Sequence, residues 1–131
     1  MVSPDGHGKR IGILVIEDEA LIATYITEVL VESGFAVAGV ASSGPEALSL
    51  ADDMQPRLAL VDIRLAGSMD GVEIARLLRE RFAVPTIFLS GMTDAATLER
   101  ARSAQPLGFL RKPFRPSQVF NAIERALKAS E

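Results

Sequence analysis

The chain has 131 residues, enough for one domain that buries its own core without metals or disulfides. Hydrophobic residues make up 48% and charged residues 24%, and the net charge of -3 gives no long-range attraction to nucleic acid or an anionic membrane. The absence of cysteine excludes disulfides and thiolate metal sites. No apolar run reaches the ~18 residues of a membrane span, and no secretory signal begins the chain, so we expect a cytoplasmic protein without direct membrane or nucleic-acid binding.

Residues 1–10 are polar and rich in glycine, a composition that favours a flexible N-terminal tail. Beyond them, short apolar runs alternate with longer amphipathic segments. In chain order these predict a strand at 11–16, a helix at 19–33, a strand at 35–40, a helix from Ser43 or Gly44 to Met54, and a strand at 58–62. A helix at 71–81, a strand at 85–90, a helix at 94–104, a strand at 107–111 and a helix at 116–129 follow. The pattern predicts one domain at 11–129.

The first predicted helix carries a broad apolar stripe. Leu21, Tyr25 and Val29 lie on one line of fourfold spacing, and Ile22, Ile26 and Leu30 lie on the next. Side chains at this spacing share one face of a helix, so the pattern predicts one broad apolar stripe.

Two later helices have a marked start. Asp70 precedes the helix at 71–81, and Asp94 stands at the start of the helix that runs to about Ala104. An aspartate at this position accepts a hydrogen bond from a free N–H group of the first turn. We therefore expect both carboxylates to cap helices.

Strands separated by helices favour a parallel sheet with helices on both faces, because the crossovers are nearly always right-handed. We expect a flavodoxin-like, doubly wound α/β fold, with a five-stranded parallel sheet in the order 2-1-3-4-5 and five helices. Ligands bind such sheets outside the carboxyl ends of the strands. This places Glu17 and Asp18 beside Asp62, with Ser90 and Lys112 at the same edge.

The side chains expected at that edge suit phosphoryl chemistry. Three carboxylates in one crevice repel one another, and their hard oxygen atoms favour Mg²⁺. Lys112 would add a positive charge and Ser90 a hydroxyl donor. An aspartate beside Mg²⁺ can be a nucleophile and form an aspartyl phosphate. The pattern therefore predicts a site that assists phosphoryl transfer by positioning and charge neutralisation.

Five motifs in order resemble the receiver domain of bacterial two-component response regulators. They are Val15–Glu19 (VIEDE), Leu60–Ile63 (LVDI), Met69–Gly71 (MDG), Leu89–Gly91 (LSG) and Gly108–Phe114 (GFLRKPF). Each motif is weak alone, but together they are specific, and the resemblance covers nearly all of residues 11–127. It implies a phosphorylation-controlled signalling domain of a phosphorelay and not an enzyme with a separate substrate.

By this resemblance, Asp62 is the phosphoacceptor and assists its own phosphorylation and dephosphorylation. The donor would be phosphohistidine on a sensor histidine kinase or a histidine phosphotransfer protein. Asp18, Asp62 and the backbone carbonyl of Arg64 would bind Mg²⁺ directly, while Glu17 would act mainly through water.

The resemblance also implies a conformational response. Ser90 would swing toward the phosphoryl group, and Lys112 would pair with the phosphoryl group. The peptide bond between Lys112 and Pro113 is expected to be cis. Phe109 matches the aromatic position whose ring moves inward when the hydroxyl residue moves. Because the common tyrosine is replaced here by phenylalanine, this movement must act through packing alone.

Two side chains flank the expected phosphoryl position. Arg64 lies two residues after Asp62, and Met92 lies two residues after Ser90. Both are long enough to hinder an attacking water molecule, so we expect them to lengthen the lifetime of the phosphorylated state. The alternative is that both are exposed and have no effect.

The chain departs from the usual receiver pattern at two further places. The loop 65–69 has no proline and is one residue longer than usual, which favours mobility. Before the fifth strand, Gln105-Pro106 replaces the usual small Gly-Ala pair. This second change alters the chain beside the expected contact face.

The resemblance indicates where the domain would contact a downstream partner but not which partner. The resemblance implies a contact face formed by the fourth helix, the fifth strand and the fifth helix, with exposed charges at Arg100, Arg102, Arg111 and Glu124. This face would bind an unknown downstream protein or form a homodimer, and a simply solvated charged surface is the alternative. Because residues 130–131 alone follow the last helix, we expect a stand-alone receiver or a segment of a longer regulator.

Two other functions fit part of the pattern. A phosphatase of the haloacid-dehalogenase type shares the nucleophilic aspartate, Mg²⁺ and lysine, but it needs a second aspartate where this chain has Arg64. A binding module with the receiver fold could also signal without phosphate. Turnover of a free phosphomonoester would indicate the phosphatase, and Mg²⁺-dependent labelling that is lost in Asp62→Asn would exclude the binding module.

Overall fold

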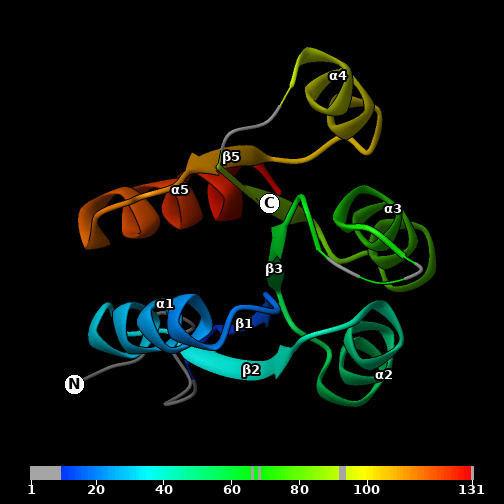
Figure 1. The fold of residues 1–131 in the computed structure, drawn as a ribbon. Helices are drawn as coiled ribbons and strands as arrows, with labels where there is room; N and C mark the ends of the chain where they lie inside the picture. Colours follow the sequence, from blue (N-terminus) through cyan, green and yellow to red (C-terminus); the bar gives the residue numbers. More distant parts are fainter. Residues whose placement is uncertain (1–9, 66, 68, 92–93, 131) are drawn as a thin grey trace.

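In the computed structural model, which describes residues 10–65, 67, 69–91 and 94–130, five parallel strands form one sheet in the order β2-β1-β3-β4-β5. The strands are β1 (Gly12–Ile16), β2 (Ala36–Ala41), β3 (Leu58–Asp62), β4 (Thr86–Ser90) and β5 (Gly108–Arg111). The helices are α1 (Ala20–Glu32), α2 (Gly44–Met54), α3 (Gly71–Phe82), α4 (Ala95–Ser103) and α5 (Pro116–Ala129). Figure 1 shows α1 and α5 on one face of the sheet and α2, α3 and α4 on the other. The predicted flavodoxin-like fold is confirmed.

The predicted element boundaries agree with the structure to within one residue at each end. This is the scatter expected where helices and strands fray. The predicted tail at 1–10 lies outside the described residues, apart from Arg10. Among the helices described, none has the length and apolar content that a crossing of a lipid bilayer requires.

The sheet separates two apolar layers, because successive side chains of a strand point to opposite faces. In β1, Ile13 and Val15 pack toward α1 and α5, whereas Leu14 and Ile16 pack toward α2 and α3. All four are fully buried. The near-continuous hydrophobicity of the strands thus reflects burial on both faces, as it does in other parallel sheets.

The apolar stripe of α1 is buried only in part. Ile26 and Leu30 are buried, but Leu21 is 87% exposed and Tyr25 is 40% exposed. The first turn of α1 lies beyond the carboxyl end of β1, so Leu21 extends past the strand side chains that would cover it. Tyr25 turns instead toward the segment between β5 and α5, and its hydroxyl donates to the backbone carbonyl of Phe114 at 3.0 Å.

The start of α3 is pressed against the end of β3. A Cβ atom on Gly71 would overlap the backbone carbonyl oxygen of Asp62, so only glycine fits this close approach. The Asp70 side chain caps the helix, as predicted, by accepting from the N–H of Glu73 at 3.0 Å. The Asp70-Gly71 pair therefore ties α3 directly to the strand that ends in Asp62.

Candidate functional site

The carboxyl ends of four strands bring the predicted site residues to one edge of the sheet. Asp62 ends β3 and Ser90 ends β4, while Glu17 and Lys112 directly follow β1 and β5. The hydrogen-bonded ladder continues past two of these ends, because the N–H of Glu17 donates to Ala41 at 2.9 Å and the N–H of Lys112 donates to Ser90 at 2.6 Å. The backbone of the sheet thus fixes where each functional side chain begins.

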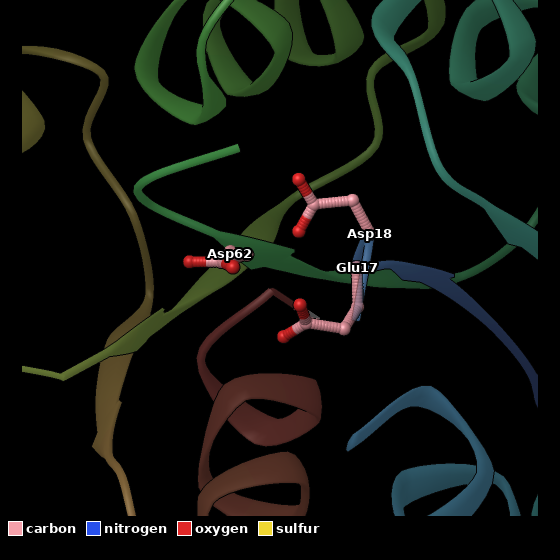
Figure 2. Close-up of side chains that lie close together, drawn as sticks. All are labelled: Glu17, Asp18 and Asp62. Carbon is pink, nitrogen blue, oxygen red and sulfur yellow. The ribbon is translucent and has the colours of Figure 1, made fainter. Parts of the chain in front are cut away.

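Three carboxylates meet at this edge. Among the described residues, Glu17, Asp18 and Asp62 offer oxygen atoms that all lie within 4.8 Å of one another. Figure 2 shows the three side chains gathered at the ends of β1 and β3. Glu17 and Asp62 are buried, whereas Asp18 is exposed. The cluster is therefore open to solvent on the side of Asp18.

Lys112 counters this negative charge. Its Nζ atom donates to Glu17 Oε1 at 2.9 Å and to Asp62 Oδ2 at 3.3 Å. Burial alone lowers the pKa of Lys112, but the hydrogen bond to Glu17 and the charges of Asp62 and Glu17 outweigh this effect and raise the pKa above its ordinary value. The ammonium is therefore charged at neutral pH. The Lys112-Pro113 peptide bond is cis, as predicted.

Glu17 is held mainly by hydrogen bonds from groups around it. Besides Lys112, the backbone N–H of Glu19 donates to Glu17 Oε2 at 3.1 Å. Burial raises the pKa of the Glu17 carboxyl, the two hydrogen bonds oppose the rise, and the nearby charge of Asp62 adds to it. Glu17 thus anchors the lysine that also contacts Asp62.

The donor set fits a small hard cation. Glu17, Asp18 and Asp62 place three carboxylates together, and the ammonium of Lys112 contacts two of them, Glu17 and Asp62. Carboxylate oxygens are the protein ligands that Mg²⁺ favours, and the exposed Asp18 leaves room for the water molecules that it retains. The residues present therefore suit a divalent cation.

Ser90 and Phe109 lie on the neighbouring strands β4 and β5. Ser90 is buried at 8% exposure, and the Phe109 side chain is 41% exposed. Phe109 pairs in register with Phe88, and the centroids of the two rings are 5.8 Å apart. The Phe109 ring thus lies at the surface, next to a fully buried aromatic side chain.

The backbone of Arg64 contacts the site, whereas its side chain extends away from the site. Its N–H donates to Asp62 Oδ1 at 3.0 Å, and its guanidinium Nη2 lies 3.7 Å from Asp94 Oδ2. The ion pair with Asp94 was not predicted, since the sequence indicated Asp94 only as a helix cap. Met92, predicted to flank the site with Arg64, lies outside the described residues.

An apolar groove adjoins the site and was missed by sequence reasoning. It has a volume of about 490 Å³, and its lining includes Leu21, Tyr25, Phe114 and Lys112. The signal that could have found it is the width of the α1 stripe, which exceeds what one helix buries against a sheet. An apolar stripe wider than the face that the helix buries leaves apolar side chains exposed, and such exposed patches mark interaction surfaces.

The sequence of residues 13–124 matches the family described as the response regulator receiver domain. The chain belongs to this family. As a receiver domain of two-component signalling, it has the acids, the hydroxyl residue and the lysine at the strand ends described above.

Curated relatives of this receiver domain include two mycobacterial regulators. The transcriptional regulatory protein PdtaR of Mycobacterium tuberculosis is 35% identical over 115 residues, which cover 88% of this chain and 56% of PdtaR. The DNA-binding response regulator MtrA of Mycobacterium leprae is 31% identical over 119 residues, which cover 91% of this chain and 52% of MtrA. The chain spans about half the length of these relatives.

Solved structures share the fold of this receiver domain. The signal receiver domain of a modulated diguanylate cyclase from Desulfovibrio desulfuricans G20 has a TM-score of 0.88 and 38% identity, covering 91% of this chain and 94% of that one. A CheY-like receiver domain protein from Methanospirillum hungatei JF-1 has a TM-score of 0.84, with 93% and 97% covered. At 23% identity, the second likeness concerns the fold alone.

Replacing Lys112 by methionine should destabilise the receiver domain. Glu17 and Asp62 would lose the hydrogen bonds of their shared cation while staying buried, so we expect the free energy of unfolding in metal-free buffer to fall by about 2 kcal/mol. Urea denaturation measures this value. Lys128→Met, at an exposed position of α5, is the matched control and should change it by less than about 0.5 kcal/mol. Equal effects of the two substitutions would contradict the charge balance described here.

Proposed function

We propose that this receiver domain is a phosphorylation-controlled switch in which Asp62 accepts a phosphoryl group from phosphohistidine. The observation that carries the proposal is the contact of Asp62 with Lys112 at 3.3 Å, inside a cluster completed by Glu17 and Asp18. A lone aspartate at a strand end is ordinary. Asp62, in contrast, is buried, contacts the same lysine as Glu17 and lies beside Asp18. These surroundings suit the transfer of an anionic group.

The transfer requires little covalent chemistry from the protein. A carboxylate oxygen of Asp62 attacks phosphorus, and the new P–O bond forms as the P–N bond to the donor imidazole breaks. The imidazole nitrogen keeps the electron pair of that bond and takes a proton from solvent. Lys112 offsets negative charge on the phosphoryl oxygens, and the Ser90 hydroxyl donates a hydrogen bond to them.

Asp18 and Asp62 are the side chains that would hold Mg²⁺. The backbone carbonyl of Arg64 would be a third protein ligand, with Glu17 acting through water. When bound, Mg²⁺ supplies positive charge against the phosphoryl oxygens. The cluster of three carboxylates, with hard oxygen donors within reach of one another, supports this assignment.

Ser90 and Phe109 would carry the signal outward. Ser90 moves toward the phosphoryl group, and the partly exposed Phe109 ring moves into the space beside it. This changes the surface formed by α4, β5 and α5, which we propose as the contact face for an unknown downstream protein or a second copy of the chain. The exposed side chains of Arg100, Arg102, Arg111 and Glu124 give this region a charged character.

A phosphatase is less favoured by the surroundings of Arg64. The acid/base aspartate that a phosphatase needs would occupy this position, but here the backbone N–H donates to Asp62 and the guanidinium pairs with Asp94. We propose that this side chain instead hinders water from reaching the phosphoryl group, which would lengthen the lifetime of the phosphorylated state. The same role for Met92 stays a prediction.

Incubation with acetyl phosphate and Mg²⁺ should add one phosphoryl group per chain and then stop, as measured by intact-mass spectrometry. Asp62→Asn should abolish the labelling, because it removes the nucleophile. Asp53→Asn, an exposed acid of α2, is the matched control and should be labelled like the native chain. Labelling of Asp62→Asn, or of no variant at all, would contradict the proposal, and turnover of a free phosphomonoester would favour a phosphatase.

The apolar groove beside Lys112 is the surface we propose for the protein that donates the phosphoryl group. A donor histidine must reach Asp62, and the groove that holds Lys112 places exposed apolar side chains next to that path. Leu21 is the most exposed large hydrophobic side chain among the described residues, at 87%. Burial of Leu21 against the kinase or phosphotransfer protein would position the two reacting groups.

Leu21→Ser should therefore slow phosphorylation by a protein donor and not by a small one. With the histidine kinase that labels the native chain fastest, we expect a loss of about tenfold in rate, the size of one interface hot spot. With acetyl phosphate the rate should stay within about twofold. Val31→Ser, at the other end of α1 and also exposed, should change neither rate. Equal slowing with both donors would overturn this assignment of the groove.

A further inference from the structure

The side chain of Arg64 joins the phosphoacceptor to the start of α4. Its backbone N–H donates to Asp62 Oδ1 at 3.0 Å, and its guanidinium lies 3.7 Å from Asp94 Oδ2. Arg64, Ser90 and Asp94 also line one cavity of about 660 Å³. The guanidinium therefore borders an open space that reaches the end of β4, beside the strand that ends in Asp62.

Asp94 divides its two carboxylate oxygens between two partners. Oδ1 accepts from the backbone N–H of Thr97 at 2.7 Å and so caps α4, while Oδ2 pairs with Arg64. The N–H and hydroxyl of Thr97 lower the pKa of Asp94, and Arg64 adds to this effect. The carboxylate is thus charged at neutral pH, and its cap on α4 does not depend on Arg64.

Of the five helices, α4 has the fewest buried side chains. Within the helix, Ala101 is its buried side chain, and Figure 1 shows α4 standing apart from α3 and α5. Among the described residues, two ion pairs connect α4 and its cap to the segment between β3 and α3. They are Arg64 with Asp94 at 3.7 Å and Arg100 with Asp70 at 3.1 Å. Both pairs lie at exposed side chains, so each adds a small contribution to the packing of Leu98 and Ala101 that also holds α4.

We propose that the Arg64 guanidinium leaves Asp94, pairs with the phosphoryl group on Asp62 and thereby releases the start of α4. This inference rests on the proposed phosphorylation of Asp62. The pair with Asp94 is long, and both side chains are 61% exposed, so it is weak and easily broken. A phosphoryl group carries nearly two negative charges and accepts paired hydrogen bonds from a guanidinium. The stronger anion would appear next to the residue whose backbone already contacts Asp62.

This exchange acts by charge and reaches α4 from the side of β3. It therefore differs from the route through Ser90 and Phe109, which acts by packing and starts from β4 and β5. The two routes converge on the cavity between α4 and β5, because Arg64, Asp94 and Phe109 all line it. Release of α4 would open this cavity further at its Asp94 side.

A double-mutant cycle between Arg64 and Asp94 tests the exchange. The probe is beryllium fluoride with Mg²⁺, which mimics a phosphoryl group on a carboxylate, and its affinity is measured by NMR titration. Asp94→Asn keeps a helix-capping oxygen but removes the competing charge, so we expect binding about threefold tighter than native. Arg64→Gln should weaken binding by about threefold. In the Arg64→Gln background, Asp94→Asn should change the affinity by less than about 1.5-fold.

Hydrogen exchange of the α4 amides gives an independent readout. Beryllium fluoride should speed exchange in the native chain, while both single variants should already exchange faster without it, because the ion pair is absent. Arg57→Gln, at an exposed position outside α4, is the matched control and should behave as native. If Asp94→Asn changes the affinity for beryllium fluoride equally with and without Arg64, the proposed exchange is wrong, while the proposed phosphorylation of Asp62 stands. If beryllium fluoride fails to bind the native chain, or binds Asp62→Asn equally, the proposed function fails with it.

Discussion

The ion pairs of Lys112 with Glu17 and Asp62 are the interaction on which the site depends. They join the ends of β1, β3 and β5, although β4 separates β3 from β5 in the sheet. The lysine side chain must therefore cross the end of β4, where the residue is the small Ser90. Without this cation, two buried carboxylates would face each other across β1 and β3, which is costly in a largely dry environment.

The same edge of the sheet concentrates charge, because three carboxylates lie there with the ammonium of Lys112. Around it, the apolar layers on both faces of the sheet are packed tightly, whereas α4 has one buried side chain. A rigid sheet thus supports the reacting side chains, and the weakly attached helix is the part that can move.

Periodicity predicted the helices and strands, and crossover handedness indicated a parallel sheet. The sheet order was adopted from the flavodoxin-like arrangement, and with that order the strand ends that carry Asp62, Asp18 and Lys112 were expected to meet. Sequence patterns did not predict the exposure of Leu21 or the pairing of Arg64 with Asp94. Helical periodicity shows which residues share a face but not how far the neighbouring sheet extends beneath them. A contact between two long, exposed side chains from different loops leaves no periodic signal at all.

The central claim is that Asp62 receives a phosphoryl group whose charge Lys112 and a bound cation then share. A crystal structure with Mg²⁺ and beryllium fluoride tests it most directly. The account predicts beryllium bonded to a carboxylate oxygen of Asp62, the cation held by Asp18 and Asp62, and the Lys112 ammonium in contact with a fluoride. A structure in which the fluoride complex occupies another residue, or in which Asp62 remains bare and paired with Lys112, would contradict it.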